Sequence, residues 1–187
     1  MKPGCDDAYR AVEDHTARLC VTLACPHPFL GIESLTGPKE VWFFNGYDSS
    51  AEQQQVVDDY AANTALMEAL LENGKRKAAL THEPIDVVTT YRPDLTRGVP
   101  WTLGRGRFLV ITVTTSGRPT GGTVFEATDG TRFIVRATEG RAAVGRRDAN
   151  VFAVRPNWSF PADDWIAADP TFWSANPRTL EPRTLER

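Results

Sequence analysis

Residues 39–47, KEVWFFNGY, constrain the fold of this chain more than any other segment. They place four large apolar side chains in a row, Val41, Trp42, Phe43 and Phe44. Successive side chains of a strand point to opposite faces, so Val41 and Phe43 share one face and the other two share the second. A strand that is apolar on both faces must be covered on both. We therefore expect the rest of the chain to supply two covers for this strand.

The composition excludes several classes of protein. With 187 residues, one domain, or one domain with a small appended lobe, is expected. The formal net charge of -3 gives no general attraction to nucleic acid or to anionic membranes. The chain has no apolar run near the roughly 20 residues of a membrane span, and its first residues, MKPGCDDAYR, lack the apolar core of a signal peptide. We therefore expect a cytoplasmic protein whose three cysteines are reduced.

The first half of the chain alternates between helix and strand signals. Apolar residues spaced three and four apart predict a helix over residues 6–23, and prolines at 26 and 28 end it. Strands are predicted over 29–35 and 39–47, separated by Thr36-Gly37-Pro38. A capping box at Ser49 or Ser50 opens a second helix, for which Asn73-Gly74 is a stop signal, with a further turn through Leu80 as the alternative. The β-branched segment 85–92 predicts a third strand.

This order is that of a split βαβ unit that lacks its first strand. It resembles the ferredoxin-like unit of the dimeric α+β barrel superfamily, which includes antibiotic-biosynthesis and haem-degrading monooxygenases. The resemblance covers about residues 1–92, half of the chain. The family begins with a strand, whereas here the helix starts almost at Met1, so either the chain starts earlier or another strand takes that place.

The second half predicts mainly strands. These cover residues 107–114, 123–128, 131–136 and 150–155, with Asp129-Gly130 as a two-residue hairpin turn. We expect an α+β protein with a ferredoxin-like unit at 1–92 and a β-rich lobe at 107–173, separated by a Pro-, Gly- and Arg-rich boundary at 93–106. An aromatic arm at 157–173 is expected to cover a surface. Residues 174–187, with the repeat PRTLE-PRTLE, are expected to form a mobile tail.

A homodimer follows from the two-sided strand. Helices cover one face of the sheet, and leaving the large side chains of the other face in water would forfeit roughly 3–6 kcal/mol for a pair. The superfamily resemblance also implies a dimer, with two sheets packed face to face around a pocket. We expect the aromatic arm to share in this cover.

The polar groups expected in such a pocket are His15, Asn45 and Tyr91. His15 lies at the edge of the first helix's apolar stripe, where it acts as a base or is an ordinary partly buried histidine. Asn45 shares a face with Phe43, where it orients a substrate oxygen or forms a turn with Gly46. Tyr91 donates a proton inside the pocket or packs in the core.

The expected substrate-binding walls of the pocket are Trp42, Phe43 and Tyr60. The resemblance implies a hydrophobic or aromatic small-molecule substrate, oxidised or rearranged without a cofactor while the substrate itself activates oxygen. Two further hypotheses remain open: a binding or sensing module with the same pocket and no chemistry, and a dimerising interaction protein whose pocket is filled by its own aromatic side chains.

No metal or cofactor is expected. Cys5, Cys20, Cys25 and His27 match the ligand count of a zinc site, but their spacing does not match one. Haem is the alternative implied by the haem-degrading relatives, since His82 is a loose positional match to their iron ligand. The other interpretation is that His82 is an ordinary exposed histidine in a loop.

Nucleic acid and dinucleotides are not expected ligands either. The glycines at 104 and 106 precede a strand, whereas a dinucleotide fingerprint follows one. The arginines at 97, 105 and 107, with Trp101, are read as a solvated loop in a negatively charged protein.

Overall fold

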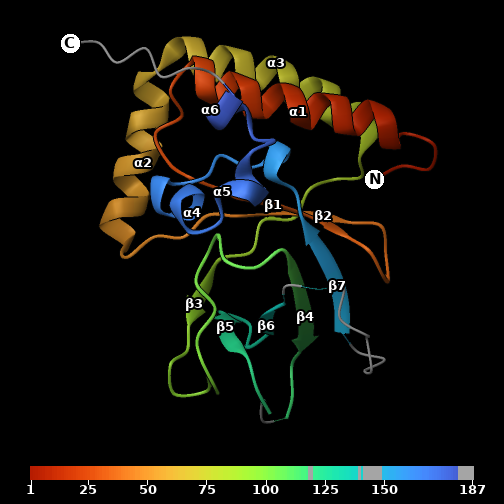
Figure 1. Cartoon of the computed structure of the whole chain (residues 1–187), viewed down its shortest axis with the longest axis vertical. Coiled ribbons are helices and arrows are strands. Elements are labelled where there is room, and N and C mark those ends of the chain that lie inside the picture. The colour runs from red at the N-terminus through yellow and green to blue at the C-terminus, as the bar shows by residue number, and fades with distance from the viewer. Residues whose placement is uncertain (118–119, 139, 141–148, 181–187) are drawn as a thin grey trace. The chain divides into compact units, whose positions relative to one another are not determined.

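A computed structural model describes residues 1–117, 120–138, 140 and 149–180 (Figure 1). The chain divides into two compact units, and neither is a single continuous segment. The helical unit comprises Met1–Gly31, Trp42–Glu83 and Arg155–Arg187. The sheet unit comprises Ile32–Val41 and Pro84–Val154. Among the described residues, no helix combines the length and apolar character needed to cross a membrane.

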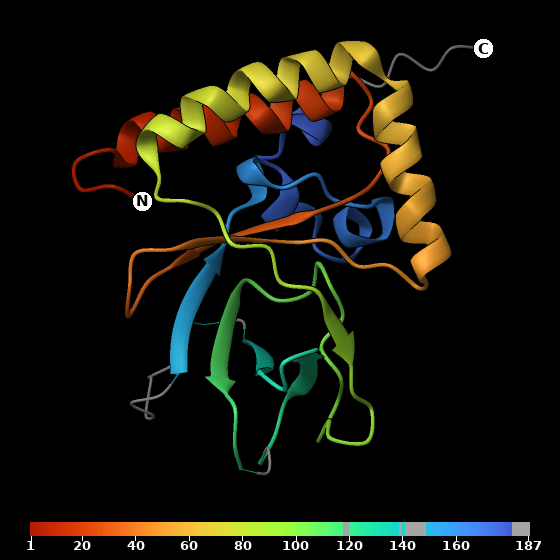
Figure 2. The same cartoon turned by 180° about the vertical axis from the view of Figure 1, so that it is seen from behind.

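The helical unit contains three long helices and a C-terminal series of short ones. The long helices are α1 (Asp6–Thr22), α2 (Ser50–Ala62) and α3 (Thr64–Leu80). The short ones are η1 (Pro156–Trp158), α4 (Asp163–Ala168), α5 (Pro170–Trp173) and α6 (Pro177–Leu180). Both views show α1 and α3 lying side by side (Figures 1 and 2).

Lys2 joins the beginning of α1 to the end of α3. Its backbone N–H donates to the carbonyl of Leu80, and its Nζ lies 2.9 Å from the carbonyl oxygen of Ala79. A cation suits the negative end of the helix dipole and satisfies carbonyls that have no partner within the helix. This contact makes the two helices antiparallel neighbours.

The helical segment after β2 is two helices instead of the single predicted one. Ser49 caps α2 as predicted, accepting a hydrogen bond from the Glu52 N–H at 3.1 Å. The chain then breaks at Asn63, whose side chain accepts from the Leu66 N–H and donates to the carbonyl of Leu23. The stop signal at Asn73-Gly74 does not end the helix, because Asn73 is buried against α1; α3 continues to Leu80, where the alternative extension was expected to end.

The strands form one seven-stranded antiparallel sheet of half-barrel type, in the order β2-β1-β7-β4-β6-β5-β3. The first three strands are β1 (Leu30–Ser34), β2 (Val41–Phe44) and β3 (Thr89–Tyr91). The remaining strands are β4 (Phe108–Thr114), β5 (Thr123–Ala127), β6 (Arg132–Thr138) and β7 (Ala149–Val154). The predicted α+β class is confirmed.

The predicted ferredoxin-like strand order is not observed. That order needs the strand at 39–47 inside the sheet and the strand at 85–92 on the far side of the missing first strand. Instead β2 is one edge of the sheet, and β3 is the other edge and pairs with β5. β1 is the interior strand next to the β2 edge; it is buried along most of its length and pairs with β7 through Ile32 and Val154.

The two-sided burial expected for KEVWFFNGY is therefore incomplete. The strand has only four residues, and its side chains are half-buried or exposed on both faces. Phe43, predicted to line the substrate pocket, is 37% exposed to solvent. The long apolar strands of the second half form the sheet core instead, with Leu109, Ile111 and Phe152 almost fully buried.

The predicted hairpin at Asp129-Gly130 is confirmed, but its turn is not the predicted two-residue one. Glu126 aligns with Arg132 and Ala127 bonds to Thr131, which leaves Thr128, Asp129 and Gly130 in the loop. The N–H of Ala127 donates to the carbonyl of Thr131 at 2.8 Å, and the Asp129 side chain accepts from the Thr131 N–H at 2.9 Å. Gly130 has φ +84°, a left-handed conformation that glycine adopts without strain. This turn sets the register of β5 against β6.

The C-terminal arm packs within the helical unit. Its three tryptophans, Trp158, Trp165 and Trp173, are buried. Asn176 is fully buried, and its Nδ2 donates to the carbonyl of Ser159 at 2.8 Å. Residues 174–180, expected as part of a tail, thus include a packed segment, while residues 181–187 lie outside the described residues.

Candidate functional site

A histidine and two tyrosines form the first candidate site, which we call the histidine–tyrosine cluster (His27, Tyr47, Tyr60). His27 follows α1 in the sequence Cys-Pro-His-Pro and is only 8% exposed. Its ring stacks on the ring of Tyr47, with centroids 4.6 Å apart and an interplanar angle of 19°. His27 Nε2 lies 2.9 Å from the carbonyl oxygen of Gly46. A carbonyl only accepts hydrogen bonds, so we assign the proton to Nε2; in the neutral ring Nδ1 is then the acceptor.

The two phenols of this cluster favour their protonated forms. Burial raises the pKa of Tyr47, and the nearby charge of Glu52 raises it further. Burial also raises the pKa of Tyr60, with a smaller contribution from Tyr47. Both hydroxyls are therefore hydrogen-bond donors at neutral pH, and the Tyr47 ring is stacked on the His27 imidazole.

The raised phenol pKa values predict a pH dependence of stability. Free tyrosine titrates near pH 10, so above that pH the unfolded chain loses these two protons before the folded protein does. The stabilisation is complete below about pH 10 and is lost as the pH rises through the folded pKa values. Absorbance titration of the phenolates should show late-titrating tyrosines, and Tyr60→Phe should remove one of them. An unchanged titration curve in this variant would contradict the assignment.

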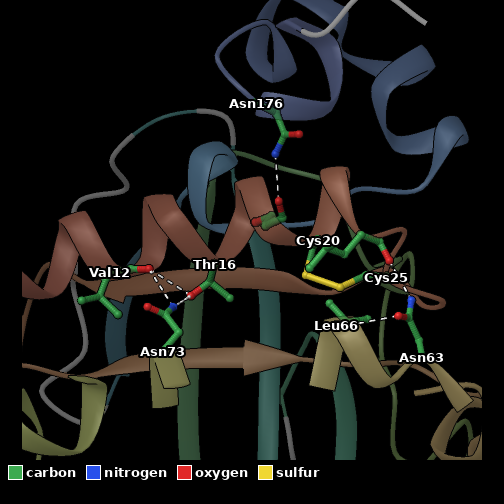
Figure 3. The surroundings of a disulfide bond; sticks show 10 residues. Val12, Thr16, Cys20, Cys25, Asn63, Leu66, Asn73 and Asn176 are labelled. Atoms are coloured by element: carbon green, nitrogen blue, oxygen red, sulfur yellow. Dashed lines mark hydrogen bonds between the residues drawn. A yellow bond between two sulfur atoms is a disulfide. The ribbon is translucent and has the colours of Figure 1, made fainter. Parts of the chain in front are cut away.

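The second feature is a polar seam between α1 and α3, defined by Glu13, Thr16, Asn73 and Lys77. Glu13 is fully buried, and its Oε2 lies 2.7 Å from Nζ of Lys77. Asn73 donates to Oγ1 of Thr16 at 2.6 Å and to the carbonyl of Val12 at 3.2 Å (Figure 3). Within the described part of the chain, neither Glu13 carboxylate oxygen has a further hydrogen-bond partner, so the Lys77 charge is its main compensation.

A disulfide joins Cys20 to Cys25 at the end of the same seam (Figure 3). The expectation of reduced cysteines is therefore wrong for this pair, while Cys5 is a free thiol. Both sulfur-bearing residues are buried with Leu66. The bond closes a short loop, which in the chain-entropy estimate contributes about 2 kcal/mol. Ala24 inside this loop has φ +53°, a conformation that the closed loop holds.

The disulfide is placed for stability more than for chemistry. Reactive thiols are exposed and lie near helix N-termini or cations, which stabilise the thiolate. Cys20 and Cys25 instead lie at the C-terminal end of α1, and both are more than nine-tenths buried. We therefore do not place them in a redox centre.

The three predicted polar residues are divided between the two units. His15 is exposed on α1, and Asn45 is exposed just after β2, both in the helical unit. Tyr91 lies on β3 of the sheet unit and is also exposed. Neither unit by itself contains all three residues.

The three residues predicted to line the pocket each pack against aromatic or buried neighbours, but not all against the same ones. Tyr60 packs beside the disulfide core and belongs to the histidine–tyrosine cluster. Phe43 packs edge-to-face on Phe29, with ring centroids 6.0 Å apart, and Trp42 packs in the same way on Phe44 at 6.3 Å.

Sequence reasoning missed His27, Tyr47 and Glu13 as functional candidates. The sequence indicates His27 only as a member of a zinc-like ligand set, yet its position between two prolines after a helix is a signal for a fixed side chain. Tyr47 directly follows Asn45 and Gly46, and Asn45 is itself a predicted site residue. Glu13 had no such signal, because an acidic residue on an amphipathic helix normally faces water. In the part of the chain described, no three His, Cys, Asp or Glu residues gather in a way that could hold a metal ion.

Comparison of the chain with protein-family models, with curated proteins and with solved structures finds no match. Conclusions on function therefore depend on the geometry of the residues described above.

Proposed function

We propose that this protein binds a small aromatic or phenolic compound at the histidine–tyrosine cluster. The observation that carries the proposal is the stacked His27–Tyr47 pair, whose imidazole is held by the carbonyl of Gly46. Ligand sites combine apolar and aromatic walls with a few fixed polar groups, and this cluster supplies both kinds. A phenolic ligand can donate to Nδ1 of His27, accept from a tyrosine hydroxyl and stack on an aromatic ring.

Neighbouring aromatic residues support the choice of ligand. Phe29 lies two residues after His27, and Phe43 lies four residues before Tyr47, so the same two chain segments carry both aromatic pairs. Phe43 remains 37% exposed and offers an apolar surface. The ligand class is the hydrophobic or aromatic small molecule that the sequence had suggested.

The catalytic form of this proposal is a cofactor-independent oxidation. His27 Nδ1 would accept the proton of a substrate phenol, and the resulting anion would donate electrons to O₂. In the overall reaction a substrate CH₂ becomes a carbonyl; one oxygen atom of O₂ enters the substrate, and the other leaves as water with the two hydrogens. The substrate supplies all four electrons, so no further reductant is needed.

Binding can be measured by NMR titration with a panel of phenols, with saturated cyclic alcohols of the same size as controls. We expect the phenols to shift the His27 and Tyr47 ring signals, and the saturated alcohols not to do so. His27→Gln and Tyr47→Leu should each weaken binding by about tenfold or more, the equivalent of about 1.4 kcal/mol. Absence of binding across the panel, or unchanged affinity in both variants with folding intact, would overturn the proposal.

Controls in the same assay test the earlier sequence-based assignment. His15→Gln, Asn45→Ala and Tyr91→Phe change exposed residues outside the cluster and should leave affinity unchanged. Loss of binding in these variants alone would favour the sequence-based site over ours. An oxygen electrode separates the two forms of the proposal: uptake that requires His27 indicates the enzyme, and binding without uptake indicates the binding protein.

A further inference from the structure

The edge of the sheet unit at β3 carries an unusual apolar segment. Residues 85–91, IDVVTTY, have strong strand propensity, but only Thr89–Tyr91 form a strand. Ile85 is 86% exposed and Val88 is 70% exposed. A strand-forming edge that exposes β-branched side chains is a ready template for pairing with another strand.

The printed hydrogen bonds show which backbone groups face this edge. The N–H of Arg92 donates to the carbonyl of Val124 on the β5 side, at 2.8 Å. Tyr91 is aligned with Phe125, and Thr89 with Ala127. In an antiparallel pair, hydrogen-bonded and non-hydrogen-bonded positions alternate. The backbone N–H and C=O of Thr90 therefore point to β5, as those of Arg92 do. The N–H and C=O groups of Thr89 and Tyr91 point to the open edge.

We propose that this edge pairs with the same edge of a second copy of the chain, antiparallel, with the two-fold axis at Thr89. Continuing the alternation, Val87 also directs its backbone groups outward, so it can exchange hydrogen bonds with Tyr91 of the second copy. Thr89 then pairs with itself across the axis. On the other face of the sheet, Asp86 of one copy is aligned with Arg92 of the second copy.

The choice of a second copy rests on the complementarity of the segment with itself. In this register a β-branched side chain meets an aromatic one (Val87 and Tyr91), threonine meets threonine, and Asp86 meets a residue of opposite charge, Arg92. All three are favourable classes of cross-strand pair. The Asp86–Arg92 match occurs twice because of the symmetry.

Arg92 can accommodate the additional carboxylate. Its guanidinium already contacts Asp94 and Glu126 through three of its nitrogen atoms. A guanidinium has five N–H donors, so donors remain for Asp86 of the second copy. A single added strand buries little surface, so we expect a dimer that dissociates on dilution.

Sedimentation velocity over a wide range of protein concentration tests the proposal. We expect a dimer at high concentration and a monomer at low concentration. Val87→Lys should weaken dimerisation by about tenfold or more, a change of about 1.4 kcal/mol or more, because one substitution alters the interface twice. Val113→Lys is the matched control, since Val113 is an exposed valine on β4, an interior strand of the sheet. A monomer at all concentrations, or equal effects of both variants, would overturn the proposal.

A crosslinking experiment tests the register. In a Cys5→Ser background, which removes the free thiol, Thr89→Cys places two thiols across the axis. Directly opposed residues of an antiparallel pair have Cα atoms about 5.5 Å apart, within disulfide range. We expect covalent dimers from Thr89→Cys on mild oxidation and none from Val113→Cys. Absence of crosslinking in Thr89→Cys, or crosslinking in both, would overturn the proposed pairing.

Discussion

Replacing Lys77 by methionine is expected to lower the free energy of unfolding by about 3–5 kcal/mol. Lys77 places its ammonium 2.7 Å from the carboxylate of Glu13, which is fully buried. Removing one partner of a buried ion pair leaves a charge without compensation, and that penalty exceeds the net value of the pair. Urea denaturation followed by circular dichroism measures the loss.

Two comparisons make this result specific. Lys75→Met changes an exposed lysine two positions earlier, paired with Glu72 at 3.3 Å, and should change stability by less than about 0.5 kcal/mol. The double variant Glu13→Met and Lys77→Met removes both charges and should recover most of the loss. If the double variant is as unstable as Lys77→Met, packing and not the buried charge is the cause.

Trp173→Ala is expected to lower the free energy of unfolding by about 3–5 kcal/mol. Trp173 is fully buried at the end of α5, with its ring 5.2 Å from that of Phe172 and 6.2 Å from that of Trp165, measured between centroids. Truncation would leave a cavity in this aromatic group, and neighbouring atoms relax only partly into such a cavity. Thermal unfolding and urea denaturation both report the effect.

Leu180→Ala is the control for this substitution, because Leu180 is 66% exposed in α6. It should have little effect on stability, since most of its side chain already contacts water. If Trp173→Ala destabilises no more than Leu180→Ala, the C-terminal arm is not an integral part of the helical unit.

Local signals in the sequence predicted local structure well. The apolar spacing and the following prolines located α1, and Asp129-Gly130 located the β5–β6 hairpin. The capping box at Ser49 located the start of α2. In each case the signal and the structure lie within a few residues of each other, so no distant partner decides the outcome.

The strand order could not be obtained in the same way. Whether β2 or β1 is the edge strand depends on which of them pairs with β7, more than a hundred residues later. Four apolar residues in a row at 41–44 suggested a central strand, but apolar character does not identify a neighbour. The short strand between Pro38 and Asn45-Gly46 instead became an edge.

The candidate site was hard to predict for a related reason. His15 and Tyr91 lie on predicted elements, where a periodic pattern indicates their faces, whereas His27 and Tyr47 lie on connecting segments that meet only after folding. The Cys20–Cys25 bond likewise depends on the turn after α1, which the sequence does not describe in atomic terms. Side chains from loops that converge in space carry no periodic signal.

The pairing of β1 with β7 also affects how the protein is made. Ile32 aligns with Val154, and translation at about 5–20 residues per second needs roughly 6–24 s to cover the intervening segment. For that interval the nascent chain presents an apolar strand whose later neighbour has not left the ribosome. We therefore expect the chain to be more open to aggregation during its synthesis than after β7 has paired with β1.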